Sequence, residues 1–262
     1  MSRIILTAAS RIGCVRSNNE DMVLAYDKLL RSDVYRTEFM TENTDRFIIA
    51  LADGMGGHNA GEVASSDTLT NLHFFLNDLP QKLSSGEFNE MMVEWLQSIN
   101  QIISSKGHAN PAMSDMGTTL VGVVYYNKKY YWINCGDSRL YRLRDGHLEQ
   151  ITCDHSLSNI RGEKKHSNII TNCIGGGCKN SYMDMFEFTD DFLTGDTYML
   201  CSDGLNDMVS DDIIEAKMNA IATPEMILGS ILFVSLPEKP DKPTMIIGAI
   251  SNIKPIKNSL YW

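Results

Sequence analysis

The sequence predicts an α+β protein in which antiparallel β-sheets are covered by helices. Apolar strand-like segments come in consecutive runs, and the helical segments come in pairs between those runs. A parallel sheet needs strict alternation of strand and helix, which this chain lacks. Segments rich in Val, Ile, Tyr and Thr predict strands at about 4–9, 22–26, 46–52, 118–126, 130–135, 138–143, 182–188, 197–201 and 244–250.

Two long helices are expected between the third and fourth strands, over about 60–77 and 88–105. Leu79-Pro80 and the Ser84-Ser85-Gly86 stretch break the pattern between them. The second helix is predicted to carry an apolar face, because its large side chains recur at helical spacing. Those side chains are Met92, Trp95, Leu96, Ile99, Ile102 and Ile103.

Two more helices are predicted late in the chain. One opens at Ser210, with Asp211 and Asp212 in its first turn, where acids suit the helix dipole. The other opens at Thr223-Pro224, an N-cap followed by proline at the first helical position. We expect a single domain over 1–262, since no linker divides the chain, and the tail 251–262 has no assigned role.

Composition excludes several classes of protein. The 262 residues carry a net charge of −10, which disfavours nucleic acid as a partner because phosphate backbones require a basic face. Apolar runs are too short for a membrane span, and the apolar stretch at the start of the sequence is too short for a signal peptide. These features predict no membrane association and a cytoplasmic location. The six cysteines form no Cys-x-x-Cys pair, so we expect reduced, mostly buried thiols.

The informative acids stand at the ends of apolar strands. Glu20-Asp21 precede one strand, Asp53 and Asp203 each end a strand and are followed by glycine, and Asp241 stands just before the last strand. Any one Asp-Gly pair, taken alone, is usually a simple turn. Four such acids favour a shared site, in which two divalent cations would neutralise four carboxylates. Oxygen ligands favour Mg²⁺ or Mn²⁺ over Zn²⁺ or Cu²⁺.

The ordered set of motifs resembles the metal-dependent protein Ser/Thr phosphatases of type 2C, in their bacterial form. The resemblance covers about residues 3 to 250. The matching segments, in chain order, are Arg16-Ser17-Asn18-Asn19-Glu20-Asp21, Asp53-Gly54-Met55-Gly56-Gly57-His58, Gly117-Thr118-Thr119-Leu120, Gly136-Asp137-Ser138-Arg139, Asp154-His155-Ser156, Asn168-Ile169-Ile170-Thr171, Cys201-Ser202-Asp203-Gly204-Leu205 and Asp241-Lys242-Pro243-Thr244.

The resemblance implies a four-layer αββα sandwich, two antiparallel sheets flanked by helices, with two Mn²⁺ or Mg²⁺ ions at one end. It implies that Asp53 bridges both metals. Glu20 and the Gly54 carbonyl would complete the protein ligands of one metal, and Asp203 and Asp241 would hold the other. Lys242 departs from the asparagine usual in the family at its position.

The resemblance also assigns residues around the metals. Asp21 would orient metal-bound waters, and Arg16 would clamp the phosphate through its guanidinium fork. Asp137 would hold a third metal, as in some bacterial relatives, or would only hydrogen-bond within a strand turn; both interpretations stay open. Met55 stands where some eukaryotic relatives carry a histidine proposed as general acid.

The implied activity is hydrolysis of phosphoserine and phosphothreonine in a protein substrate. A metal-bridging hydroxide would attack the phosphorus of the phosphate ester directly. The implied partners are that phosphorylated protein and a cognate bacterial Ser/Thr kinase whose action the enzyme opposes. Lys164 and Lys165, in the short segment between His155 and Thr171, would either attract a phosphopeptide or lie in a solvated loop. The alternative function is a catalytically weak or inactive phosphatase-like module with a regulatory or binding role.

Overall fold

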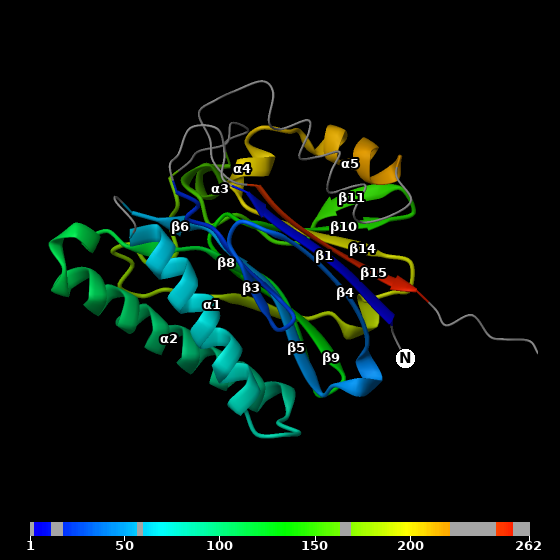
Figure 1. Cartoon of the computed structure of the whole chain (residues 1–262), viewed down its shortest axis with the longest axis horizontal. Helices are drawn as coiled ribbons and strands as arrows, with labels where there is room; N and C mark the ends of the chain where they lie inside the picture. Colours follow the sequence, from blue (N-terminus) through cyan, green and yellow to red (C-terminus); the bar gives the residue numbers. More distant parts are fainter. Residues whose placement is uncertain (1–2, 12–17, 57–59, 163–168, 221–244, 254–262) are drawn as a thin grey trace, which may run out of the picture.

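The computed structural model describes residues 3–11, 18–56, 60–162, 169–220 and 245–253, and Figure 1 shows their arrangement. Two six-stranded sheets form the centre, and every strand pair in them is antiparallel. The first sheet contains, in spatial order, β11 (His147–Gln150), β10 (Arg139–Arg144), β14 (Thr197–Cys201), β15 (Met245–Ile253), β1 (Arg3–Arg11) and β4 (Val34–Met40).

The second sheet and a small third sheet complete the β-structure. The second sheet contains β13 (Asp184–Glu187), β9 (Lys129–Cys135), β8 (Leu120–Tyr126), β5 (Arg46–Ala52), β2 (Met22–Ala25) and β3 (Lys28–Leu30). The small sheet has three strands, β12 (Ile174–Gly175), β7 (Gly117–Thr118) and β6 (Gly54–Met55).

Helices cover the outer faces of the two large sheets, which gives four layers (Figure 1). On one side α1 (Ala60–Asp78) and α2 (Ser85–Ala109) pack on the second sheet, and on the other side α4 (Asp203–Asn206) and α5 (Asp211–Asn219) pack on the first. The short α3 (Leu157–Arg161) and three 3-10 turns, Thr41–Asn43, Pro111–Met113 and Thr189–Asp191, lie in connections. The predicted αββα sandwich is confirmed.

Strand β5 illustrates why the continuous apolar runs form the inner strands. Ile48 and Ala50 pack toward α1 and α2, whereas Phe47, Ile49 and Leu51 pack into the core between the two large sheets. Both faces of the strand are therefore buried, and both sets of alternate side chains must be apolar. Within the described ranges, no helix combines the length and apolar character that crossing a bilayer requires.

Several predicted boundaries need correction. Helix α2 begins at Ser85 rather than 88, because Ser84 caps it and exchanges hydrogen bonds with Glu87 in a capping box. Ile102 is exposed, unlike the rest of the predicted apolar face. The predicted strand over 118–126 is interrupted at Thr119, where the chain passes from β7 in the small sheet to β8.

The late helices have different outcomes. The helix predicted to open at Ser210 is α5, with Ser210 at its N-cap. The helix predicted at Thr223-Pro224 and most of the tail over 251–262 lie outside the described residues. The strands β3, β4, β6, β11 and β12 and the helices α3 and α4 were not predicted from the sequence.

Candidate functional site at the acidic end of the sandwich

The strand register brings the predicted acids of the second sheet to one edge. Met22 in β2 pairs with Ala52 in β5, so Asp21 and Asp53 flank the same end of this antiparallel pair. Asp203 follows β14 in the facing sheet and begins α4. The four-layer packing therefore places acids from both sheets at a common rim.

Asp53 lies among like charges. Desolvation raises the pKa of its carboxyl well above the usual range, and the neighbouring charge and hydrogen bond of Asp21, then the charges of Asp203 and Asp137, raise it further. Like charges at this spacing repel one another unless a proton or a cation neutralises them. The sequence-predicted residues Asp21, Asp53, Asp137 and Asp203 are thus brought into electrostatic contact.

A hydrogen bond joins the two large sheets at this rim. The Ser202 hydroxyl donates to Oδ2 of Asp21 at 3.0 Å, across 181 residues of sequence. Asp21 is 4% exposed, and its backbone N–H donates to the Asn19 side-chain oxygen at 3.0 Å. Both bonds fix the position of the Asp21 carboxyl relative to the strand ends.

Glu20 and Gly54 also meet, at a close approach to the first turn of α1. A Cβ added at Gly61 would lie 2.9 Å from Oε1 of Glu20 and 2.9 Å from the carbonyl oxygen of Gly54. A Cβ at Gly54 would lie 2.1 Å from the Gly61 carbonyl oxygen, so neither position accepts a side chain. The two predicted oxygen ligands of one metal are therefore near neighbours, and two glycines permit this.

The backbone of Asp53 is held by a pair of threonines whose role the sequence did not reveal. The Asp53 N–H donates to Oγ1 of Thr119 at 3.0 Å, and the Thr118 hydroxyl donates to the Asp53 carbonyl at 2.9 Å. The Thr119 hydroxyl also lies 2.8 Å from that of Ser138. The Gly117-Thr118-Thr119 and Gly136–Arg139 motifs thus position Asp53 and Asp137 together.

Comparison with known proteins identifies the family at this point. The family model described as protein phosphatase 2C matches residues 25–225, which is most of the chain. The chain belongs to the protein phosphatase 2C family. The predicted resemblance is confirmed.

Relatives of this phosphatase 2C chain include bacterial proteins named as Ser/Thr phosphatases. Serine/threonine protein phosphatase PstP of Mycobacterium tuberculosis is 32% identical over 95% of this chain, which spans only 46% of PstP, about half its length. Serine/threonine phosphatase stp of Listeria welshimeri is 33% identical over 67% of this chain and 75% of that protein.

A solved structure shows the same fold. The crystal structure of the PstP catalytic domain, described as a complex with two manganese ions, matches 96% of this chain and all of that domain. The TM-score is 0.70 and the sequence identity is 28%. This phosphatase 2C chain therefore has the fold of a domain that was crystallised with two manganese ions.

The donor set of this phosphatase 2C chain suits hard divalent cations. The described candidates, Glu20, Gly54, Asp53 and Asp203, present only oxygen atoms, and the repulsion at Asp53 calls for positive charge. Within the described ranges, no three His, Cys, Asp or Glu side chains by themselves form a metal-binding group. The predicted set draws one ligand from a backbone carbonyl and one from Asp241, which lies outside the described residues.

Other sequence-predicted residues also lie outside the described part of the chain. These are Arg16, which is predicted to clamp the phosphate, His58 of the Asp53–His58 motif, and Lys164, Lys165 and Lys242. Their predicted roles stay predictions.

An arginine that the sequence analysis did not single out supports the acidic rim. Arg31 donates from Nη1 to the Asn19 carbonyl at 2.5 Å and from Nη2 to the Glu62 carbonyl at 2.7 Å. Its burial lowers the pKa of its guanidinium, whereas the charges of Glu62, Asp21 and Glu20 raise it. Arg31 thus ties the segment that carries Glu20 to the first turn of α1.

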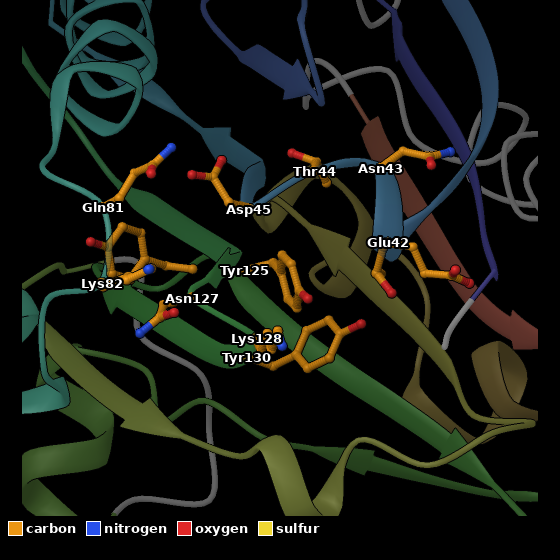
Figure 2. Close-up of a pocket in the computed structure, with 12 residues that line it drawn as sticks. Glu42, Asn43, Thr44, Asp45, Gln81, Lys82, Tyr125, Asn127, Lys128 and Tyr130 are labelled. Atoms are coloured by element: carbon orange, nitrogen blue, oxygen red, sulfur yellow. The ribbon is translucent and has the colours of Figure 1, made fainter.

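A cavity of about 700 Å³, whose lining residues are drawn in Figure 2, lies beside the start of β5. Tyr125, Tyr130 and the 127–128 turn line it, together with residues just before β5. Asp53 follows the opposite end of β5, and a seven-residue strand spans about 20 Å. This cavity is therefore separate from the acidic site.

Proposed function

We propose that this chain is a metal-dependent protein serine/threonine phosphatase acting on phosphoserine and phosphothreonine. The observation that supports this most is that Asp53 lies beside Asp21, Asp203 and Asp137, so that desolvation and then the neighbouring charges raise the pKa of its carboxyl. Two bound Mn²⁺ or Mg²⁺ ions would lower the pKa of a water and stabilise charge on the phosphoryl oxygens. Glu20, Asp53, the Gly54 carbonyl, Asp203 and Asp241 would hold them.

The other predicted residues would act on water and phosphate. Asp21, whose Oδ2 accepts a hydrogen bond from Ser202, would orient waters bound at the rim. Arg16 would hold two phosphate oxygens through its planar guanidinium, so that the attacking water and the Ser or Thr oxygen lie in line. The choice between Mg²⁺ and Mn²⁺, and a third ion at Asp137, stay open within this proposal.

The buried thiol next to the site does not suit a cysteine mechanism. Burial raises the pKa of Cys201 to about 12, and its side chain is fully buried. The thiol therefore keeps its proton at neutral pH and is a poor nucleophile. A hydrolytic mechanism without a covalent cysteine intermediate is consistent with this environment.

The proposal extends to partners and context. A phosphorylated protein would be the substrate, and a Ser/Thr kinase would supply the phosphate that is removed. A single catalytic domain over 1–262 and a cytoplasmic location are part of the same proposal. A regulatory or binding module that hydrolyses nothing is the alternative function.

Hydrolysis of a phosphothreonine peptide tests the proposal. We expect release of phosphate with Mn²⁺, none with EDTA, and a loss of at least about a hundred-fold in Asp203→Asn. Asp212→Asn is the matched control, because Asp212 is an exposed acid in α5. Protein that binds Mn²⁺ but releases no phosphate would favour the regulatory alternative.

A further inference from the structure

Two thiols meet in the segment that follows α3. The Cys173 thiol points at Sγ of Cys178, and the two sulfur atoms lie 3.3 Å apart. Cys173 is buried, whereas Cys178 is partly exposed, and both are free thiols. A disulfide needs an S–S distance of about 2.05 Å, so the sulfurs would have to approach by about 1.2 Å.

The turn between the two cysteines is built from three glycines. Gly175, Gly176 and Gly177 have φ values of 72°, 55° and 80°, which glycine adopts without strain. A Cβ at Gly176 would lie 2.8 Å from Sγ of Cys173, so only glycine lets the turn fold over that thiol. The turn is therefore shaped to keep the sulfurs in contact, and its glycine backbone can absorb the small approach.

The cysteine turn is connected to the acidic site through the small sheet. Strand β12 lies between the two cysteines, and its Ile174 pairs with Thr118 in β7. Thr118 pairs in turn with Gly54 in β6. The N–H of Gly176 also donates to the Met116 carbonyl at 2.7 Å. Backbone pairing therefore connects the turn to the segment that carries Asp53 and Gly54.

We infer that Cys173 and Cys178 form a reversible thiol–disulfide site that reacts with hydroperoxides and alters metal binding at Gly54. The metal-binding part of this inference rests on the proposed function. The partly exposed Cys178 sulfur attacks a peroxide oxygen, the O–O bond breaks, and a sulfenic acid and water form. Burial raises the pKa of the Cys173 thiol, so Cys173 does not attack the peroxide itself; because its sulfur is held 3.3 Å from that of Cys178, it attacks the sulfenic sulfur and displaces the oxygen as a second water. Two thiols lose two electrons and two protons, and one hydrogen peroxide becomes two waters.

Peptide mapping of the full chain tests the disulfide directly. Trypsin releases a peptide over 166–179 that contains Cys173 and Cys178 and no other cysteine. After hydrogen peroxide and alkylation, we expect this peptide to lose two hydrogens and both alkyl groups, and to regain alkylation after dithiothreitol. The exposed Cys153 is the internal reference and should remain mostly alkylatable over the same time. A peptide that stays reduced, or gains oxygen without losing hydrogens, overturns the inference.

Titration of the reduced and oxidised protein with Mn²⁺ tests the connection to the acidic site. We expect oxidation to weaken Mn²⁺ affinity several-fold and dithiothreitol to restore it. In the Cys178→Ser variant, oxidation should leave Mn²⁺ affinity unchanged. The Cys153→Ser variant should respond to oxidation as the native chain does. Disulfide formation without any change in Mn²⁺ affinity overturns the connection. If the reduced protein binds no Mn²⁺ at all, the proposed function fails, while the peptide map still decides whether the thiol site exists.

Discussion

Arg139 forms a bidentate ion pair with Asp154: Nε lies 2.9 Å from Oδ1 and Nη2 lies 2.7 Å from Oδ2. The two side chains are only 12% and 9% exposed. Arg139 belongs to the Gly136–Arg139 motif, and Asp154 precedes His155 and Ser156. The pair therefore joins the strand end that carries Asp137 to the start of the segment containing α3.

Breaking this pair should destabilise the protein strongly. We expect Arg139→Met to lower the free energy of unfolding by about 3 kcal/mol, because it removes the cation that neutralises the buried Asp154 carboxylate. Lys106→Met, which removes a partly exposed ion pair with Asp67, should cost less than about 1 kcal/mol. Urea unfolding measures the free energy of both variants. Equal losses of stability would contradict a structural role for the Arg139–Asp154 pair. Adding Asp154→Leu to Arg139→Met should recover part of the loss.

Several of the strands that the sequence predicted, such as β2, β5 and β8, are buried on both faces. Strand β5 is a continuous apolar run because it packs between the α1–α2 layer and the other sheet. Strand β4 was not predicted, because it is an edge strand whose side chains, such as Thr37 and Glu38, are not consistently apolar. The start of α2 was misplaced because the Ser84–Glu87 capping box resembles a breaker until its hydrogen bonds are known.

The acidic residues of the candidate site could be predicted from the sequence, but the residues that hold them in place could not. Acids at strand ends are visible in the sequence as polar residues that follow apolar runs, and Asp53 and Asp203 belong to this class. Arg31 gave no such signal, because it lies between a short strand and a polar turn. Its role depends on long-range contacts with Asn19 and Glu62, which only the folded chain reveals.

The raised pKa of Asp53 predicts a pH-dependent instability of the metal-free protein. Because the pKa is higher in the folded than in the unfolded state, ionisation penalises the folded state as pH rises above the unfolded value of 3.8. We expect Asp53→Asn to raise the melting temperature in EDTA at pH 7 and to have little effect near that lower pH. The same variant should lose the stabilisation that Mn²⁺ gives the native chain. A variant less stable than the native chain in EDTA at pH 7 would contradict this prediction.

His155 is predicted to support the Asp137 loop through one ring nitrogen. The Gly136 N–H donates to Nδ1 at 3.1 Å, so the ring proton is on Nε2, which lies 3.0 Å from Oδ2 of Asp184. We expect His155→Leu to lower the free energy of unfolding by about 2 kcal/mol, because it leaves a buried N–H without an acceptor. His155→Asn, which keeps an acceptor near Nδ1, should lose less. Amide hydrogen exchange at Gly136 should rise in the Leu variant, and unchanged exchange would contradict the role.

Arg31 is predicted to control metal affinity without contacting the metals. Its guanidinium fixes the Asn19 carbonyl one residue before Glu20, so Arg31→Met should free the Glu20 segment from the first turn of α1. We expect about ten-fold weaker Mn²⁺ binding, as is typical when a supporting hydrogen bond behind a ligand is lost, and a smaller change in kcat at saturating Mn²⁺. Arg36→Met is the matched control, because Arg36 is exposed on β4. Calorimetric titration separates the two variants: equal Mn²⁺ affinities would show that Arg31 does not hold Glu20 in place.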